Sequence, residues 1–158
     1  MPILSVIFSL HNNNIFNYII LTKQGSDLLI HHIELYVSDL KKSSLFWGWL
    51  LEELGYIPFQ KWDEGRSWKW KDSYIVFVQV EESFVDHGYH RKRIGLNHLA
   101  FHAKSREHVD YLFNQLETMG INILYRDKYP FAGGKGHYAL YFEDPDRIKV
   151  EVVAVTHS

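Results

Sequence analysis

The sequence predicts an α+β fold made of two βαβββ modules, and three observations support this prediction. A strand that begins with histidine occurs twice, at His32 and at His98, and an amphipathic helix follows each time. A glycine ends each helix at nearly the same distance: Gly55 lies 23 residues after His32, and Gly120 lies 22 residues after His98. Three strand-like segments follow each glycine, so one unit appears twice in the chain.

Length and composition limit the number of domains and the classes of partner that the chain can have. The 158 residues fit one compact domain, and apolar residues, at 46%, are numerous enough to fill a core. A net charge of −2 does not indicate nucleic-acid binding, and the lack of cysteine is compatible with a reducing, cytoplasmic location. Residues 1–27 hold two apolar runs, each too short to span a bilayer, so we expect an N-terminal extension and no membrane segment.

The first module is expected at residues 28–84. From His32 to Asp39 the side chains alternate with the period of two that a half-buried strand requires. Asp39 is a good N-cap, and Gly55 lies where a left-handed C-cap favours glycine. The apolar stripe of the intervening helix consists of Phe46, Leu50 and Leu54, with Trp47 and Leu51 beside them. Further strands are expected at 56–62, 67–70 and 74–80.

A connector, residues 85–95, leads to the second module, residues 96–158. The strand that begins at His98 ends at Ser105, a second good N-cap. The helix that follows has an apolar stripe formed by Val109, Leu112, Phe113, Leu116 and Met119. Further strands are expected at 122–128, 137–142 and 149–155, with a turn at 143–146 between the last two.

Residues 28–155 resemble the glyoxalase/bleomycin-resistance/extradiol-dioxygenase superfamily, also called the vicinal-oxygen-chelate proteins. The first module carries its signature as His32, Leu35, Val37 and Asp39-Leu40. The more specific signal closes the second module, as Tyr141-Phe142-Glu143-Asp144-Pro145-Asp146-Arg147-Ile148-Lys149-Val150-Glu151-Val152-Val153. The resemblance implies curled mixed sheets that form a cup with a divalent metal at its floor. It also implies frequent homodimers, in some members with modules exchanged between chains.

Carried over to this chain, the resemblance places metal ligands at His32, His98 and Glu151. Equivalent positions in the repeat are expected to bring the two histidines together at the cup floor, although a lone strand histidine is more often a hydrogen-bonded residue. Alternation turns Glu151 away from Val150 and Val152, and a carboxylate facing a cavity is costly unless it is paired or metal-bound. The ion could be Zn, Ni, Mn, Fe or Co, and Glu151 is also the candidate catalytic residue.

The fourth ligand position departs from the family pattern. The strand at 74–80 should supply Glu or Gln, but the commonest alignment puts Phe77 there, which cannot bind a metal. Gln79 lies two residues on, on the same face, and its amide oxygen could serve as the ligand. Phe77 puts four-ligand glyoxalase chemistry in doubt, whereas Gln79 keeps it open.

Basic residues of the connector and the segment after a glycine-rich stretch are candidates for substrate binding. Arg91 and Arg93 could hold an anionic group, although a basic loop cluster is more often only solvated. Residues 132–136 are rich in glycine but are not a phosphate loop, since no helix follows them. A mobile lid is the better interpretation, and His137 and Tyr138 just after it could reach substrate.

Tryptophans recur on the early strands of the first module, at positions 62, 68 and 70. Such residues are usually core or wall residues, with no catalytic role. If Trp70 lines the cup, it would favour an apolar or aromatic substrate.

Two classes of function fit these observations. The first is a metal-dependent, glyoxalase-like lyase or isomerase that acts on a small substrate chelated through vicinal oxygens; the same ligands would also suit an Fe(II) extradiol-type dioxygenase. The second is a metal-free protein that binds a small molecule such as a drug, which Phe77 and the tryptophans favour. In both cases we expect a homodimer, with neither nucleic acid nor a membrane as partner.

Overall fold

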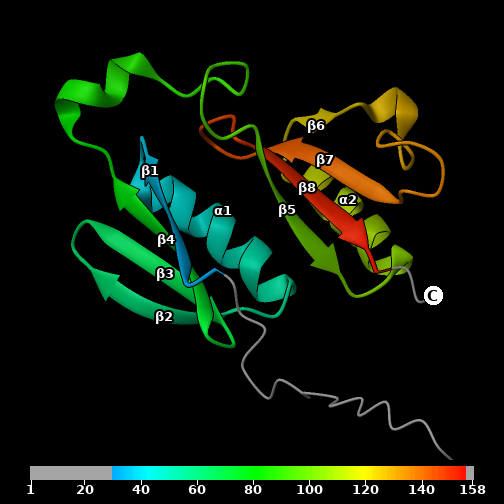
Figure 1. The fold of residues 1–158 in the computed structure, drawn as a ribbon, viewed down its shortest axis with the longest axis horizontal. Helices are drawn as coiled ribbons and strands as arrows, with labels where there is room; N and C mark the ends of the chain where they lie inside the picture. The colour runs from blue at the N-terminus through cyan, green and yellow to red at the C-terminus, as the bar shows by residue number, and fades with distance from the viewer. Residues whose placement is uncertain (1–29, 156–158) are drawn as a thin grey trace, which may run out of the picture.

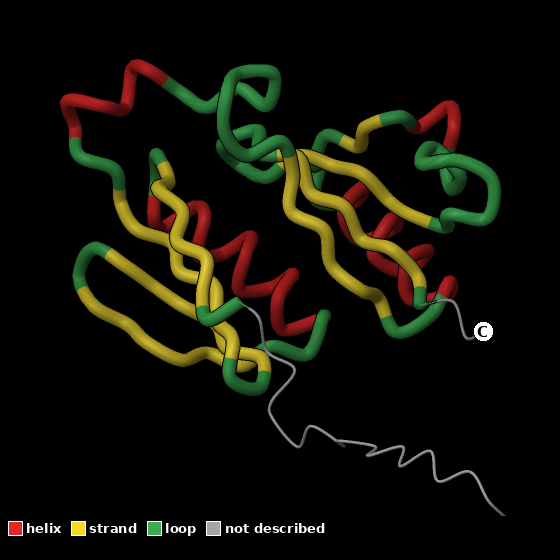
Figure 2. Tube along the Cα trace, in the orientation of Figure 1, coloured by secondary structure: helices red, strands yellow, loops and turns green. Residues whose placement is uncertain are grey.

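The computed structural model describes residues 30–155 as two sheets side by side, with helix α1 between them and α2 on the second sheet (Figure 1). The sheets have the strand orders β1-β4-β3-β2 and β5-β8-β7-β6. The pairs β1–β4 and β5–β8 are parallel, and all other neighbouring strands are antiparallel. The predicted α+β fold of two βαβββ modules is confirmed (Figure 2).

In the first module the helix begins and ends where the sequence predicts. The Asp39 side chain accepts a hydrogen bond from the backbone N–H of Lys42 at 3.0 Å and so caps α1. Gly55 follows the helix with a φ of 95°, a backbone conformation that favours glycine. The elements are β1 (His32–Val37), α1 (Leu40–Glu53), β2 (Ile57–Trp62), β3 (Gly65–Trp70), β4 (Ser73–Gln79) and the 3₁₀ helix η1 (Glu82–His87), which crosses the expected boundary with the connector.

In the second module one strand is much shorter than predicted. Only Ile123 and Leu124 of the segment 122–128 pair with a neighbouring strand, so that prediction was wrong. Tyr125 has left-handed backbone geometry, with φ at 53°, and this turns the chain into a 3₁₀ helix. The elements are β5 (His98–Ala103), α2 (Arg106–Thr118), β6 (Ile123–Leu124), η2 (Arg126–Lys128), β7 (Ala139–Glu143) and β8 (Lys149–Ala154).

The N-terminal extension expected at 1–27 lies outside the described residues. Within 30–155, no helix is long and apolar enough to cross a membrane.

One hydrophobic core runs through both modules, and Trp47 of α1 joins them. Its fully buried ring stacks on Phe77 of β4 at 4.8 Å between centroids and lies 6.2 Å from Phe101 of β5. Its indole N–H donates to the buried Asp144 carboxylate at 3.0 Å. Trp47 therefore contacts both sheets, which fixes the position of one module against the other.

Asp144 should make the stability of this junction depend on pH. Burial raises the pKa of Asp144 to about 7, although hydrogen bonds from the backbone N–H of Ile148 and from Trp47 act in the opposite direction. In the unfolded chain the carboxyl titrates near pH ~4. Between these values the folded protein holds a proton that the unfolded chain has released, so the free energy of unfolding falls as the pH rises from about 4 to 7.

We expect the Asp144→Asn variant to lose this contribution to the pH dependence. Relative to wild type, its unfolding free energy should improve between pH 5 and pH 8 by up to about 3 kcal/mol, because about two units of the pKa difference lie above pH 5. Urea unfolding at both pH values measures the change, with Asp127→Asn as an exposed control. A constant difference between Asp144→Asn and wild type at the two pH values would contradict this prediction.

Candidate functional site

Alternation gives the second sheet a core face and an opposite face, which we call the cup face. Val150 and Val152 of β8 are fully buried in the core, so Glu151 between them points to the cup face. The strand register places Ala100 of β5 and Tyr141 of β7 directly beside Glu151. The alternation predicted from the sequence therefore positions Glu151 correctly, and the register identifies its neighbours.

Glu151 is the centre of a group that we call the Glu151 cluster, formed with His98, His137 and Tyr141. The Glu151 side chain is nearly buried, and its Oε2 lies 3.2 Å from Nε2 of His98. Its Oε1 lies 2.5 Å from Nε2 of His137 and accepts a hydrogen bond from the Tyr141 hydroxyl at 3.0 Å. Both carboxylate oxygens thus have partners, as a buried carboxylate requires.

Neighbouring groups set the roles of His98 and Tyr141. The Asn97 side-chain oxygen lies 2.8 Å from Nδ1 of His98 and can accept a hydrogen bond from a proton there. Nε2 then pairs with Glu151 only when it also carries a proton, and a metal ion would take the place of that proton. Burial raises the pKa of Tyr141 to about 12, and the Glu151 carboxylate contributes to the rise. The Tyr141 hydroxyl is therefore a proton donor at neutral pH.

His32 does not join this cluster. It stacks on Tyr74 at 4.9 Å and contacts His31. The other end of β1 approaches the second sheet, because the backbone N–H of Ser38 donates to Asp146 at 3.0 Å just before β8. Since a six-residue strand spans about 17 Å, His32 lies at the end of β1 remote from His98. Equivalent places in the repeat do not bring the two histidines together within one chain.

Gln79 is committed to the N-terminus of α1. Its amide oxygen accepts a hydrogen bond from the backbone N–H of Leu40 at 2.8 Å, and its amide nitrogen donates to the carbonyl of Ser38 at 2.9 Å. Phe77, two residues earlier on the same face, is fully buried against Trp47. That face is the core face, so in this structure the Gln79 amide serves the start of α1, and its role as a metal ligand stays a prediction.

Trp70 also faces the helix side of its sheet. The register of β3 and β4 puts it on the same face as Trp68 and Phe77, and its ring packs on Gly55 after α1. It therefore does not line the cup face, and the expectation that it binds substrate is not supported by its position.

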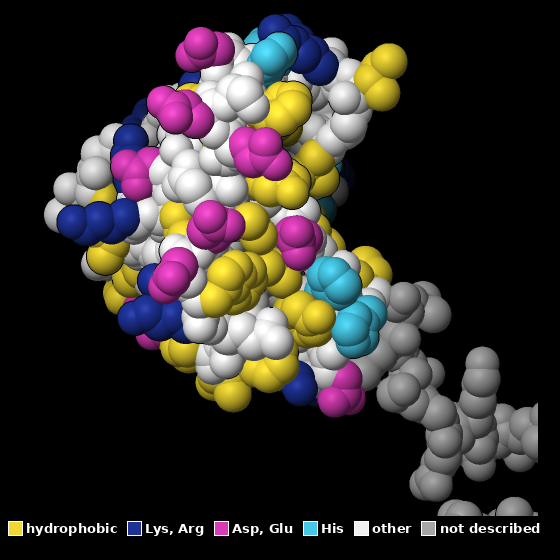
Figure 3. Space-filling view, turned by 90° about the vertical axis from the view of Figure 1, so that its left-hand side faces the viewer, with side chains coloured by type: hydrophobic (Ala, Val, Ile, Leu, Met, Phe, Trp, Pro, Cys, Tyr) yellow, Lys and Arg dark blue, Asp and Glu magenta, His cyan; other side chains and the backbone are white. Residues whose placement is uncertain are grey.

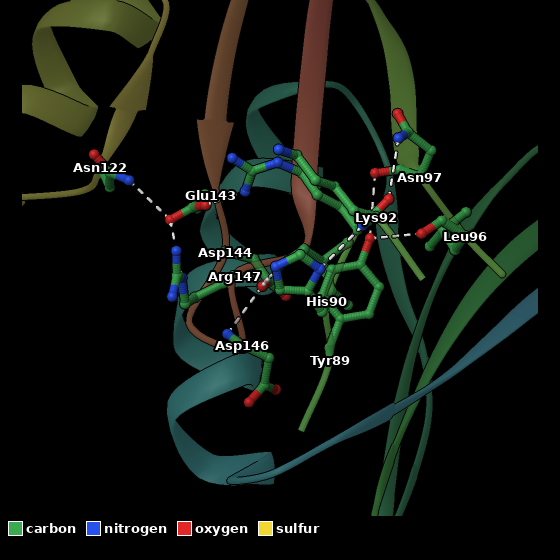
Figure 4. Close-up of polar contacts among 12 residues, drawn as sticks. Tyr89, His90, Lys92, Leu96, Asn97, Asn122, Glu143, Asp144, Asp146 and Arg147 are labelled. Atoms are coloured by element: carbon green, nitrogen blue, oxygen red, sulfur yellow. Dashed lines mark hydrogen bonds and ion pairs between the residues drawn. The ribbon is translucent and has the colours of Figure 1, made fainter. Parts of the chain in front are cut away.

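The two connector arginines are engaged elsewhere. Arg91 forms an ion pair with the buried Glu143. Glu143 also accepts a hydrogen bond from Asn122 at 2.8 Å and lies 3.5 Å from Arg147 (Figure 4). Burial raises the pKa of Glu143, but the bonds from Asn122 and Arg91 and the charges of both arginines outweigh it and lower this pKa. Arg91 therefore neutralises a buried carboxylate.

Arg93 donates to the backbone carbonyl of His87 at 3.0 Å. It also lines a cavity of about 310 Å³ between the connector and the end of β1. The walls of this cavity include Leu35, Tyr36, Tyr89, Leu96 and Ile148. Glu151 does not line it, so the cavity is separate from the Glu151 cluster.

Two polar residues outside the predicted site belong to its surroundings. Lys149 lies two residues before Glu151 on the same face of β8, and its ammonium lies 6.0 Å from the centre of the Tyr141 ring. Tyr141 was part of the family signature without an assigned role. The period-two pattern of β7 and β8 could have indicated both residues, whereas nothing in the local sequence indicates that His137 reaches Glu151.

The donors fit a divalent transition metal in kind, since imidazole nitrogen and carboxylate oxygen are its common ligands. The set is incomplete in one chain: among residues 30–155, no three His, Cys, Asp or Glu side chains are spaced to hold one ion. His98 and Glu151 provide two adjacent donors on an accessible face. A metal ion held here by three protein ligands would need its third from a rearranged His137 or from outside the chain.

Comparisons with known proteins agree with this architecture. Residues 29–152 match the family model of the Glyoxalase/Bleomycin resistance protein/Dioxygenase superfamily. The uncharacterized protein YqjT of Bacillus subtilis (strain 168) is 60% identical over 125 residues, which cover 79% of this chain and 98% of YqjT.

Solved structures show the same fold. A crystal structure of a provisionally assigned glyoxalase from Bacillus halodurans is 55% identical, with a TM-score of 0.79 over 80% of this chain and 96% of that one. Lactoylglutathione lyase from Agrobacterium tumefaciens is 20% identical, with a TM-score of 0.56 over 84% of this chain and 96% of that one. At this low identity, the second similarity concerns the fold alone.

Proposed function

The chain belongs to the glyoxalase/bleomycin resistance protein/dioxygenase superfamily, and we propose that it is a metal-dependent, glyoxalase-like lyase or isomerase. Its substrate would be a small molecule with two neighbouring oxygens. The observation that carries the proposal is the buried Glu151 carboxylate on the cup face, 3.2 Å from the imidazole of His98. A buried acid between imidazoles is the arrangement that a metal site or a proton-transfer site uses.

In this proposal His98 and Glu151 hold the metal ion, and His32 of a second copy completes the ligand set. When bound, the ion would act as a Lewis acid toward the two substrate oxygens. Zn, Ni, Mn, Fe and Co all accept such nitrogen and oxygen ligands. His32 is available for this role because it is exposed on β1 and has no contact with the Glu151 cluster of its own chain.

The exposed apolar surface of the first module supports a homodimer. Large side chains that remain exposed there include Tyr36, Ile57, Phe59 and Trp62, and hydrophobic side chains gather on this side of the molecule (Figure 3). Apolar surface of this kind is typical of protein interfaces. If the partner covered this surface with the cup face of its second module, the partner's His98 and the partner's Glu151 would lie toward His32.

The residues of the cluster have distinct roles in the proposed reaction. The Oε1 atom of Glu151 accepts a proton from the substrate carbon, and His137, 2.5 Å away, receives or returns it. Tyr141 remains protonated, and its hydroxyl would turn from Glu151 to donate a hydrogen bond to a substrate oxygen when substrate binds. Lys149 lies about 7 Å along the strand from Glu151 and would bind an anionic substrate group, the role that the sequence suggested for Arg91 and Arg93.

A subunit-mixing experiment tests the metal site and its assembly from two copies. The His32→Ala and His98→Ala variants each lack a ligand, so each should retain little Zn²⁺ after dialysis. After subunit exchange in an equimolar mixture, each mixed dimer has one site in which both histidines are intact. Metal retention should then rise to about a quarter of the wild-type value, since half the dimers are mixed.

Three results would contradict the proposal. Wild type that retains no Zn²⁺, Mn²⁺ or Ni²⁺ would reject metal-dependent catalysis. A His32→Ala variant that binds metal like wild type would show that His32 is not a ligand. A mixture that retains no more metal than the separate variants would exclude a site shared between copies.

A metal-free protein that binds a small molecule is the second candidate function. It is favoured by the cluster itself, in which both Glu151 oxygens already have partners. It is also favoured by Phe77 at the fourth ligand position and by the hydrogen bond that engages the Gln79 amide oxygen. This candidate predicts wild type without metal that still retains a small molecule in native mass spectrometry. An Fe(II) dioxygenase would instead retain iron and consume oxygen.

A further inference from the structure

We propose that Asp110 of α2 is a positioning residue for the Glu151 cluster. In this proposal it ties together both ends of the glycine-rich loop, residues 130–137, and thereby holds His137 against Glu151. The inference uses the proposed function only in treating Glu151 as the centre of the site.

Asp110 binds the residues on either side of the loop. Its Oδ1 atom accepts hydrogen bonds from the hydroxyl of Tyr129, just before the loop, and from the hydroxyl of Tyr138, just after it, at 2.7 Å. The backbone N–H of Ala139 also donates to the carbonyl of Pro130 at 2.9 Å. The two ends of the loop therefore lie close together, and one carboxylate oxygen of Asp110 binds the residues that flank them.

Both tyrosines are suited to remain donors in this arrangement. Burial raises the pKa of Tyr129 and that of Tyr138, and the Asp110 carboxylate raises both further. The guanidinium of Arg106 lies 5.2 Å from the centre of the Tyr138 ring, where it balances the charge of Asp110. The Asp110 contacts thus remain formed throughout the neutral pH range.

The two residues just before β7 connect this contact to the site. Tyr138 reaches Asp110 on the α2 side of the sheet, whereas its neighbour His137 reaches Glu151 on the cup face. The carbonyl of Tyr138 accepts a hydrogen bond from the backbone N–H of Ala154 of β8 at 2.9 Å. Tyr138 is held at its backbone and at its hydroxyl. Because His137 immediately precedes it in the chain, the Tyr138–Asp110 contact on the α2 side of the sheet determines the direction in which His137 points on the cup face.

The loop itself packs on the cluster. A Cβ atom at Gly133 would lie 2.3 Å from Cδ2 of His137 and 2.7 Å from the Tyr141 hydroxyl, so only glycine allows the backbone to approach this closely. Two members of the cluster are therefore in contact with a loop whose ends Asp110 controls. Releasing those ends should loosen His137 before it affects the core.

The test compares Asp110→Asn and Tyr138→Phe with a matched control, Tyr111→Phe. Tyr111 neighbours Asp110 on α2, but its hydroxyl donates to Glu53 at 3.3 Å, far from the loop in the sequence. The first readout is the rate at which diethyl pyrocarbonate modifies His137, followed by peptide mass spectrometry. The second is hydrogen exchange of the backbone amides of residues 131–137.

We expect both rates to rise about fivefold in Tyr138→Phe and at least as much in Asp110→Asn, while Tyr111→Phe stays at the wild-type rates. Exchange in α1 should remain unchanged, which separates local loosening from loss of the fold. Wild-type rates in both Asp110→Asn and Tyr138→Phe would overturn the proposal. If Asp110→Asn does not fold, Tyr138→Phe alone decides it.

These readouts are independent of metal and substrate. If His137 is released in the variants but wild-type protein takes up no metal, Asp110 is a positioning residue and the proposed metal chemistry is wrong. If wild type binds Zn²⁺ and the variants leave His137 protected, the metal proposal stands and the role of Asp110 is rejected.

Discussion

Replacing Glu151 with alanine is expected to lower the affinity for Zn²⁺ by two orders of magnitude or more, because the variant loses the acidic ligand of the proposed metal site. Even a residue that only orients a metal ligand costs about 10–100-fold in affinity when it is replaced, so removal of a ligand should cost at least as much. Calorimetric titration with Zn²⁺ and elemental analysis of the purified protein measure the effect. Glu151→Gln should behave similarly, since it removes the charge and retains the size.

The fold should survive the change. Glu151 faces away from the core, and Val150 and Val152 on either side of it remain buried. Removing an almost buried carboxylate also removes the free-energy cost of its burial, which offsets part of the stability lost with its packing contacts. Circular dichroism and thermal unfolding check this point, and Glu82→Gln, an exposed carboxylate of η1, is the matched control. Equal Zn²⁺ affinity in wild type and Glu151→Ala would remove Glu151 from the ligand set.

Replacing Trp47 with alanine should have the largest effect on stability, lowering the free energy of unfolding by about 3–5 kcal/mol. The ring is fully buried and contacts Phe77 and Phe101, which belong to different modules. Its removal leaves a cavity between the sheets and deprives Asp144 of a hydrogen-bond donor. Trp47→Phe keeps part of the packing and loses the donor, so its cost should be intermediate. Urea unfolding monitored by circular dichroism measures both.

Trp70 supplies the control for tryptophan removal. Its ring is 48% exposed at the end of β3, so Trp70→Ala should cost clearly less than Trp47→Ala. Because Trp47 joins the modules, its alanine variant is also the one in which the modules could unfold in separate steps. Similar destabilisation by Trp47→Ala and Trp70→Ala would show that the junction does not depend on Trp47.

Local patterns in the sequence were sufficient to predict most helices and strands, and to predict which side chains share a face in most strands. The repeat from His32 to Gly55 and from His98 to Gly120 identified both modules, because caps and glycines act within a few residues of the chain. Alternation also placed Glu151 opposite its valine neighbours, since the direction of successive side chains in a strand is a local property. The strand predicted at 122–128 failed because the turn at Tyr125 has no signal in the local pattern.

The contacts of the site depended on the tertiary structure. His137 and Tyr141 reach the same oxygen of Glu151 only through the course of the glycine-rich loop and the register of β7 with β8. Gln79 shares a face with Phe77 as predicted, but the packing of α1 made it the core face. His32 lies apart from His98 because it is the first residue of β1, whereas the C-terminal end of β1 meets the second sheet through Ser38. A sequence determines which way each side chain points along its own strand, but pairing between distant segments decides what that side chain meets, and such pairing depends on the energy of the whole core.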